Sequence, residues 1–228
     1  MTCCCNPRGC DELFNPRYAR RMAQRYRTHG LDRSSSRMVA YLERHEQLDG
    51  ATVLEIGGGV GALQLELLKR GAARTTNLEL SPAYDDQAYE LAREAGLEDR
   101  VSRRIHDIAV APDEVEPADI VVLHRVVCCY PDYEKLLGAA ATRARRALVF
   151  SHPPCNPVSR ALLGAQNLIF KALGREFRAF AHPPRAMRAV LERHGLQPAF
   201  RHRGLPWQFE GRRRSAAPDP STAASSTA

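Results

Sequence analysis

The stretch Ala51–Gly61, Ala-Thr-Val-Leu-Glu-Ile-Gly-Gly-Gly-Val-Gly, decides the fold of this chain. A short apolar strand that carries Glu55 runs into a glycine-rich turn, and Ala62–Lys69 then begins a helix. Glycine lets the backbone adopt positive φ and pass close to a ligand. The first turn of a helix offers unpaired N–H groups. The stretch is therefore typical of a nucleotide-binding turn between a strand and a helix.

Two kinds of nucleotide cofactor fit such a turn. Gly57, Gly59 and Ala62 match the G-x-G-x-x-G/A spacing of dinucleotide-binding loops. However, Glu55 stands two residues before the first glycine, where a carboxylate suits a cation better than a pyrophosphate. Residues 1–50 also precede this strand, whereas dinucleotide domains usually begin with it. These two features favour a cationic nucleotide over NAD(P).

The pattern Glu-x-Gly-x-Gly-x-Gly at Glu55–Gly61 resembles motif I of the class I S-adenosylmethionine methyltransferases. In that family, the acid and the glycine loop hold the cationic methionine end of the cofactor. The resemblance implies S-adenosylmethionine as cofactor. It assigns Glu55 and four glycines to its binding: Gly57, Gly58, Gly59 and Gly61.

Strand and helix patterns alternate along the chain after this motif. Strands are expected at 51–56, 74–80, 101–106, 119–124 and 147–151, and helices at 62–70, 82–95, 133–145, 158–173 and 184–194. Such alternation predicts a parallel sheet with helices on both faces. Two closing strands, Gln197–Arg203 and Pro206–Glu210, predict a terminal hairpin, which the methyltransferase fold has and most dinucleotide domains lack. The fold class is α/β, a doubly wound seven-stranded, mostly parallel sheet.

Two helices are expected before the sheet. Asp11–His29 has an apolar stripe at spacings of four, and Gly30 ends it. Ser34–Ser36 is the expected cap of the second helix. We predict that residues 1–50 form a Cys-rich segment and helical lid and that residues 51–210 form the cofactor-binding domain. Residues 211–228 have no apolar periodicity and are predicted to be a disordered tail. The apolar stripe of Asp11–His29 consists of Phe14, Tyr18, Met22 and Tyr26.

Acidic residues lie at the end of the second predicted strand and just after the third. Glu79 lies 22 residues beyond Gly57, where an acid grips ribose hydroxyls in this type of fold. The resemblance assigns Leu80 to the cofactor beside Glu79, and it assigns Asp107 and Ile108 to the adenine, with Asp107 accepting from the exocyclic amine. His124, at the end of the fourth strand, is expected to contact the cofactor as well.

Candidate catalytic residues also lie at the carboxyl edge of the sheet, where ligands bind in open α/β folds. Tyr130, His124 and His152 are the three candidates on the acceptor side. Tyr130 can face the sulfonium, and a histidine can act as a base. Two plainer alternatives stay open: Tyr130 as a core aromatic, and His152 as a turn histidine bonded to backbone.

The segment around Cys128–Tyr130, with the cysteines of Cys3–Cys10, resembles uncharacterised bacterial methyltransferases related to the magnesium-protoporphyrin O-methyltransferases. The resemblance covers most of Cys3–Phe209. The porphyrin enzymes carry a His-Tyr pair where this chain has Cys129-Tyr130. The resemblance therefore does not extend to a porphyrin substrate.

Composition limits the remaining classes. The chain has 228 residues and a formal net charge of +7. It has no apolar run long enough to span a membrane, and its first residues do not resemble an export signal. We expect a cytoplasmic protein whose seven cysteines are reduced, and we expect no nucleic-acid substrate. A metal site of Cys3, Cys4, Cys5 and Cys10, completed by Cys128 or Cys129, matches no known zinc spacing, so none is assigned.

The sequence thus predicts an S-adenosylmethionine-dependent methyltransferase that acts on a small molecule or natural product. Two alternatives stay open. One is an NAD(P)-dependent oxidoreductase, and the other is a non-catalytic cofactor-binding protein of the same fold. The acceptor atom and the oligomeric state are not indicated by the sequence.

Overall fold

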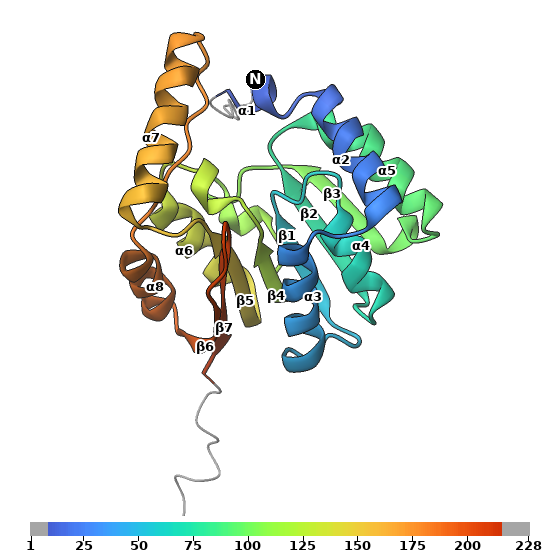
Figure 1. The fold of residues 1–228 in the computed structure, drawn as a ribbon. Coiled ribbons are helices and arrows are strands. Elements are labelled where there is room, and N and C mark those ends of the chain that lie inside the picture. The colour runs from blue at the N-terminus through green and yellow to red at the C-terminus, as the bar shows by residue number, and fades with distance from the viewer. Residues whose placement is uncertain (1–8, 216–228) are drawn as a thin grey trace, which may run out of the picture.

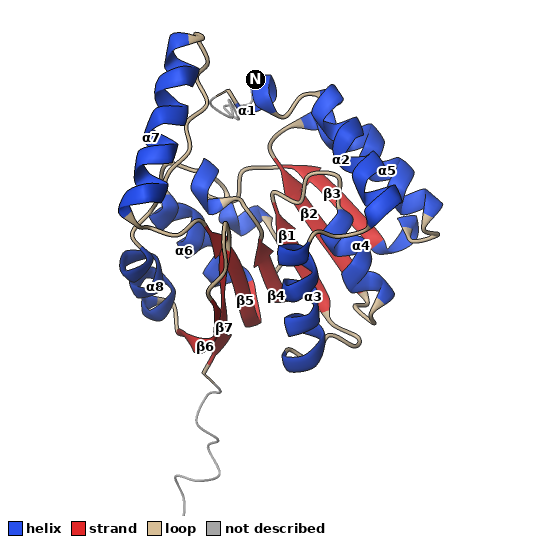
Figure 2. Cartoon of the chain, in the orientation of Figure 1, coloured by secondary structure: helices blue, strands red, loops and turns tan. Residues whose placement is uncertain are grey.

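The computed structural model describes residues 9–215 and contains a seven-stranded sheet covered by helices on both faces (Figure 1, Figure 2). The strand order is β3-β2-β1-β4-β5-β7-β6, and β7 is antiparallel to both of its neighbours. The strands are β1 (Thr52–Ile56), β2 (Arg74–Glu79), β3 (Val101–Ile105), β4 (Ala118–Leu123), β5 (Ala144–His152), β6 (Leu196–His202) and β7 (Gln208–Arg214). The predicted doubly wound, mostly parallel sheet with a terminal antiparallel hairpin is confirmed.

The helices follow the predicted alternation. Within the described residues they are α1 (Cys10–Leu13), α2 (Pro16–His29), α3 (Arg33–His45), α4 (Ala62–Lys69), α5 (Asp85–Glu94), α6 (Tyr133–Arg143), α7 (Pro157–Ala172) and α8 (Pro184–Arg193). Short 3₁₀ turns join several elements, among them η1 (Pro82–Tyr84) and η4 (Val127–Cys129). No helix in this part of the chain is long and apolar enough to cross a membrane.

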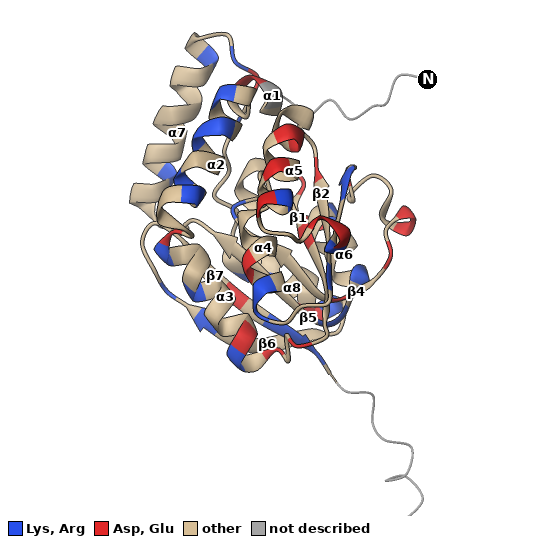
Figure 3. Cartoon of the chain, turned by 90° about the vertical axis from the view of Figure 1, so that its right-hand side faces the viewer, with Lys and Arg blue, Asp and Glu red and all other residues tan. Residues whose placement is uncertain are grey.

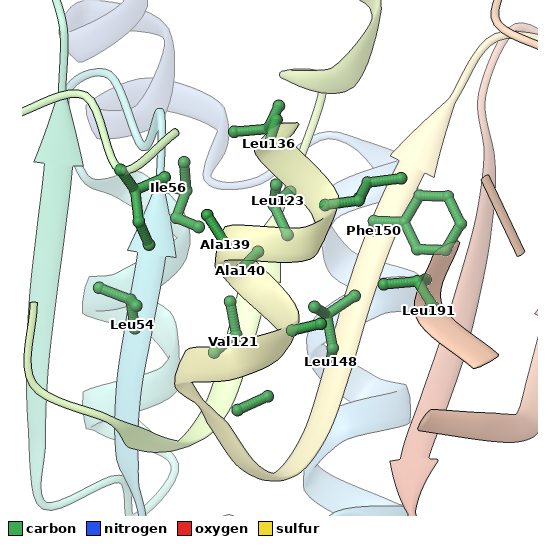
Figure 4. Close-up of a cluster of buried hydrophobic side chains, with 14 of the residues drawn as sticks. Leu54, Ile56, Val121, Leu123, Leu136, Ala139, Ala140, Leu148, Phe150 and Leu191 are labelled. Atoms are coloured by element: carbon green, nitrogen blue, oxygen red, sulfur yellow. The ribbon is translucent and has the colours of Figure 1, made fainter. Parts of the chain in front are cut away.

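The apolar run of β4 explains how one strand serves both faces of the sheet. Val121 and Leu123 belong to the cluster under α6 and α8, whereas Ile120 and Val122 belong to the cluster under α3 and α4. All four side chains are fully buried. Figure 4 shows the first cluster, in which α6 lies across the strands. A central parallel strand is buried on both faces, so it has no polar alternation.

The N-terminal helices differ from prediction in their boundaries. The expected single helix Asp11–His29 is interrupted, because Asn15 accepts hydrogen bonds from the backbone of Arg17 and Tyr18 and starts α2 at Pro16. The second helix, α3, is capped by Asp32 and not by Ser34–Ser36. Asp32 satisfies the free N–H groups of the first turn, so the serines become part of the helix.

The C-terminal strand also runs further than predicted. Gly211–Arg214, expected to begin a disordered tail, form the second half of β7 and pair with β5 and β6. Arg212 is buried and bonds Glu210 and Glu192 at 3.1 Å each. The run of arginines suggested an exposed tail, but Arg213 pairs with Glu46 and Arg214 donates to the backbone carbonyls of Ala141 and Ala144. The remaining tail, residues 216–228, lies outside the described residues.

Candidate functional site

A cavity of about 310 Å³ opens at the carboxyl ends of β1, β2 and β4. Its size falls at the lower end of the range for small-molecule sites. Phe14, which follows α1, and Tyr18, Met22 and Tyr26 of α2 form part of its wall. Most of the predicted site residues line it: Glu55, Gly57, Gly58, Gly59, Glu79, Leu80, Asp107, Ile108, His124 and Tyr130. Gly61 and His152 are not among the lining residues.

The glycine loop has backbone angles and close contacts that only glycine accommodates without strain. Gly57, Gly59 and Gly61 have φ values of +67°, +55° and +78°, the region that favours glycine. A Cβ at Gly58 would lie 2.6 Å from the Glu55 carboxylate, and one at Gly57 would lie 2.5 Å from Val126 Cγ2. The protein's own packing therefore requires glycine at position 57. The sequence had suggested close approach of a ligand as the only reason.

Glu55 is the most unusual group of the cavity. Its side chain is buried, and its Oε2 atom has no hydrogen-bond partner among the described residues. Burial, opposed by a backbone hydrogen bond from Gln64 and the charge of Arg103 and assisted by the charge of Glu79, raises the pKa of Glu55 to about 7. A buried acceptor without a partner is costly. The carboxyl group is therefore placed to receive a donor or a cation from a ligand.

Glu79 holds the glycine loop in place. Its Oε2 accepts from the backbone N–H of Gly59 at 2.9 Å. Its Oε1 accepts from the backbone N–H groups of Leu80 and Ser81 at 2.8 and 3.3 Å. A carboxylate has about four acceptor positions, so one position remains for a ligand hydroxyl. Glu79 thus fixes the loop whether or not it also contacts a ribose.

Asp107 and Tyr130 contact each other across the cavity wall. The Tyr130 hydroxyl donates to Asp107 at 3.0 Å, and Asp107 also accepts from the Ala109 backbone N–H at 3.0 Å. Ile108 is buried beside them. Since Asp107 is the residue assigned to the adenine amine, the structure puts Tyr130 at that end of the cavity. A role for Tyr130 beyond the sulfonium methyl stays a prediction.

His124 lies in a hydrogen-bond network that engages both ring nitrogens. Nδ1 is 3.1 Å from Ser151 Oγ, and Nε2 is 3.0 Å from Ser35 Oγ. Ser35 donates to Asp32, so the network assigns the ring proton to Nε2, which then donates to Ser35. Burial and the charge of Arg125 lower the pKa of His124 to about 4. A neutral ring with both nitrogens engaged is better suited to positioning the site than to accepting a proton.

His152 lies away from this cavity. It is buried, its Nδ1 is 2.9 Å from the Pro153 carbonyl oxygen, and its Nε2 is 3.8 Å from Glu210. The backbone contact agrees with the alternative of a turn histidine. Glu210 in turn accepts from Arg188 at 2.9 Å. The structure therefore does not bring His152 together with His124 and Tyr130.

Sequence reasoning missed Asp32, Ser35 and Arg125, which also line the cavity. Arg125 follows His124 directly but has an unusual φ of +63°, and its guanidinium bonds Asp32 at 2.8 Å. It also lies 5.3 Å from the centre of the Trp207 ring. The sequence signals of Asp32 and Arg125 were weak, because a helix cap and a loop arginine occur in many proteins. Only the contact between two distant segments makes them part of the site.

Cys10 and Cys129 line the same cavity. The Sγ atoms of Cys128 and Cys129 are 3.6 Å apart, and the contact with Cys128, together with burial, raises the pKa of the Cys129 thiol. Within residues 9–215, no three His, Cys, Asp or Glu side chains form a group that could hold a metal ion. Cys3, Cys4 and Cys5 lie outside the described residues.

A family model described as a methyltransferase domain matches residues 53–148. The matched region contains the glycine loop, Glu79, Asp107 and the His124–Tyr130 segment, and the strand order is that of the predicted fold. Residues 53–148 therefore form a methyltransferase domain. The predicted membership in the S-adenosylmethionine-dependent class, with S-adenosylmethionine as its cofactor, is confirmed. No curated protein sequence matches the chain.

Solved structures share the fold of this methyltransferase domain over most of the chain. Magnesium protoporphyrin IX methyltransferase from Synechocystis PCC 6803 with bound SAH has a TM-score of 0.71 and 21% identity, over 90% of this chain and 97% of that one. An O-methyltransferase family protein from Burkholderia thailandensis has a TM-score of 0.70 and 19% identity, over 92% of this chain and 64% of that one.

A putative RNA methyltransferase from Pyrococcus horikoshii has a TM-score of 0.57 and 15% identity, over 85% of this chain and 86% of that one. The predicted relation to the magnesium-protoporphyrin enzymes therefore holds at the level of fold. At these identities, the likeness does not carry a substrate over to this chain.

Proposed function

We propose that this protein is an S-adenosylmethionine-dependent methyltransferase that acts on a small molecule. The observation that carries the proposal is the Glu55 carboxyl, buried at the glycine loop with Oε2 unpartnered. The ammonium group of the cofactor's methionine end is a partner of the right charge. A hydrogen bond to a charged group is worth about 1.5–3 kcal/mol, which corresponds to about tenfold or more in affinity.

The other cofactor contacts are proposed along the same wall of the cavity. Glu79 would accept from the ribose hydroxyls at its remaining acceptor position, while Asp107 would accept from the adenine amine. Leu80 and Ile108 would pack against the nucleoside. The bound cofactor supplies an activated methyl group on a sulfonium. The protein's own task is then mostly alignment of the acceptor and exclusion of water.

A small acceptor is favoured by the walls that enclose the cavity. The segment before α3 contributes Phe14, Tyr18 and Met22 to the cavity wall, and Asp32 and Ser35 come from the start of α3. Such a cavity admits a compact acceptor more readily than a folded polymer. The neutral His124 has both ring nitrogens engaged, which supports catalysis by alignment over catalysis by this histidine as a base.

Calorimetric titration with S-adenosylmethionine, S-adenosylhomocysteine, NAD and NADP tests the cofactor assignment. We expect binding of the two sulfur compounds with one site per chain and no heat from either dinucleotide. Tight binding of NAD or NADP alone would establish the oxidoreductase alternative. Methyl transfer to a panel of small hydroxyl, amine, thiol and carboxylate compounds then tests catalysis. Cofactor binding without transfer to any acceptor class would favour the non-catalytic alternative.

A further inference from the structure

A row of polar side chains crosses three neighbouring strands next to the glycine loop. Glu55 of β1 lies opposite Asn77 of β2, and Asn77 lies opposite Arg103 of β3. Side chains at paired positions share one face of the sheet. Glu55 and Asn77 are buried, and the Arg103 side chain is 14% exposed. Neither Asn77 nor Arg103 lines the cavity, so any effect of these two residues on a ligand is indirect.

Two residues of this row, together with Glu79, hold the glycine loop by its backbone. Asn77 Oδ1 accepts from the Gly58 N–H at 3.2 Å, and Arg103 Nη1 donates to the Gly59 carbonyl oxygen at 2.8 Å. The Gly59 N–H donates to Glu79 at 2.9 Å. Side chains of β2 and β3 therefore bond both polar backbone groups of Gly59. Since glycine has little conformational preference of its own, these bonds fix the direction of its two peptide groups.

Arg103 is itself held in place by the start of a helix. Helix α5, which carries acidic residues along its length (Figure 3), begins at Asp85. Arg103 Nε donates to Asp85 at 2.6 Å. A guanidinium is planar and presents its donors in a fixed geometry, unlike the ammonium of a lysine. The bond to Asp85 therefore orients the Nη1 donor toward Gly59.

Arg103 also acts on Glu55 through its charge. Burial raises the pKa of Glu55, whereas a backbone hydrogen bond from Gln64 of α4 lowers it. Among the neighbouring charges, Glu79 of β2 raises this pKa and Arg103 of β3 lowers it. Arg103 Nη2 is buried and has no hydrogen-bond partner within residues 9–215, so Asp85 does not engage the whole guanidinium. The charge of Arg103 thus favours the ionised form of Glu55.

We propose that Arg103 is a positioning residue for S-adenosylmethionine binding, although it lies outside the cavity. Its bond to Gly59 keeps the glycine loop in the shape that the cofactor meets, and its charge keeps Glu55 ionised beside the cofactor's ammonium group. The first effect rests only on the identity of the cofactor, and Asn77 supports it through Gly58. The second effect rests on the proposed contact between Glu55 and the ammonium group.

Titration calorimetry with S-adenosylhomocysteine tests the proposal on two variants. Arg103→Met loses both the bond to Gly59 and the charge, so affinity should fall about tenfold or more. Arg103→Lys keeps the charge without the planar group of donors, so affinity should fall several-fold. The matched control is Arg104→Met. Arg104 donates to the Glu114 carbonyl oxygen at the same 2.8 Å, but from the opposite face of β3, so its loss should leave affinity unchanged.

The pH dependence of affinity separates a positioning role from a purely structural one. Removal of a cation raises the pKa of a nearby acid. The ratio of the Kd at pH 6.5 to the Kd at pH 8 should therefore rise roughly twofold in Arg103→Met. It should keep its wild-type value in Arg103→Lys and in Arg104→Met. An arginine that only stabilises the fold would lower the melting temperature in thermal unfolding and leave both this ratio and the affinity of the folded protein unchanged.

The same variants in a Glu55→Gln background distinguish failure of this proposal from failure of the Glu55 contact. We expect Arg103→Met to lower affinity less there than in wild type, because only the bond to Gly59 is then lost. If Glu55→Gln alone binds like wild type, the Glu55 contact is refuted, and the effect on the loop is decided by Arg103→Met in that background. The proposal is wrong if Arg103→Met binds S-adenosylhomocysteine as tightly as wild type, or if Arg104→Met weakens binding equally. If Arg103→Met does not fold, Arg103→Lys decides, since wild-type affinity in that variant refutes the fixed bond to Gly59.

Discussion

Arg125 bonds the carboxylate of Asp32 through Nη2, at 2.8 and 2.9 Å to its two oxygens. This ion pair joins the loop after β4 to the first turn of α3, across a separation of 93 residues in the chain. Asp32 also caps α3 by accepting from the backbone of Ser34 at 2.9 Å. Both residues line the cavity. The pair therefore holds the N-terminal part of the chain against the proposed cofactor site.

Arg125→Gln should loosen this attachment with little loss of stability. The two side chains are 35% and 23% exposed, and pairs of this kind contribute about 0–1 kcal/mol to the free energy of unfolding. We expect a faster dissociation of S-adenosylhomocysteine, by several-fold, measured by stopped-flow or surface plasmon resonance. Arg143→Gln breaks a pair of equal length with Asp113, at 2.8 Å, outside the cavity, and is the matched control. Equal dissociation rates for both variants would show that the pair of Arg125 and Asp32 does not help to retain the ligand.

Glu55→Gln should weaken ligand binding without lowering the stability of the fold. The variant loses the negative charge proposed to meet the cofactor ammonium, so affinity for S-adenosylhomocysteine should fall about tenfold or more. Its folded state should be as stable as wild type or more stable at pH 8, because an amide needs no ionisation in a buried site. Calorimetry and thermal unfolding measure the two effects. Glu43→Gln on the exposed side of α3 should change neither; unchanged affinity in Glu55→Gln would refute the motif assignment.

The pKa of Glu55 also predicts how both quantities depend on pH. Its folded pKa of about 7 lies above its ordinary value of 4.5, so its burial opposes folding increasingly as pH rises from about 4.5 to 7. Ligand binding should show the opposite sign. A cationic group prefers the ionised carboxylate, so affinity should rise about tenfold between pH 5.5 and 7. Calorimetry in buffers of different ionisation enthalpy should show proton release below pH 7. Glu55→Gln should lack both effects.

Three glycine variants test the packing of the loop. Gly58→Ala puts a Cβ 2.6 Å from buried atoms of Glu55 and Asn77, and overpacking of this kind costs about 1–3 kcal/mol. At Gly59 the nearest atom is 3.5 Å away in Tyr84, but φ is +55°, so alanine there should cost about 1–2 kcal/mol through backbone strain. Gly164→Ala, within α7 and in open space, should stabilise by about 0.5–1 kcal/mol. Urea unfolding measures all three; a neutral Gly58→Ala would contradict the tight contact.

Tyr130→Phe tests whether Tyr130 acts at the adenine end of the cavity, beside Asp107, or on the acceptor side. The hydroxyl donates to Asp107 at 3.0 Å, so its loss should raise the KM or Kd for the cofactor by several-fold and leave kcat within about twofold. Tyr133→Phe is the control, because the Tyr133 hydroxyl donates to the exposed Glu134 at 3.2 Å. A loss of kcat with unchanged cofactor affinity would instead support the sequence-based role on the acceptor side.

The sequence by itself determined the class of the sheet and the position of the cavity. A strand, a glycine-rich turn and a helix are local patterns, and their order along Ala51–Lys69 admits few folds. Glu55, Glu79 and Asp107 were found because each lies at or just after the carboxyl end of a strand, and in a parallel sheet these ends lie at the same edge. Such residues can be predicted because their positions depend on the strand that carries them.

Only the tertiary structure decided which groups are engaged with one another. The pair of Asp32 and Arg125 and the contacts of His124 with Ser35 and Ser151 join segments far apart in the chain, which no local pattern encodes. The same holds for Gly211–Arg214. Their arginines resemble an exposed tail in the sequence, but the segment pairs with β5 and β6, and the arginines bond Glu46, Glu192, Glu210 and backbone carbonyls. Local period and turn chemistry set each element, but burial and charge pairing depend on neighbours that only the folded chain brings together.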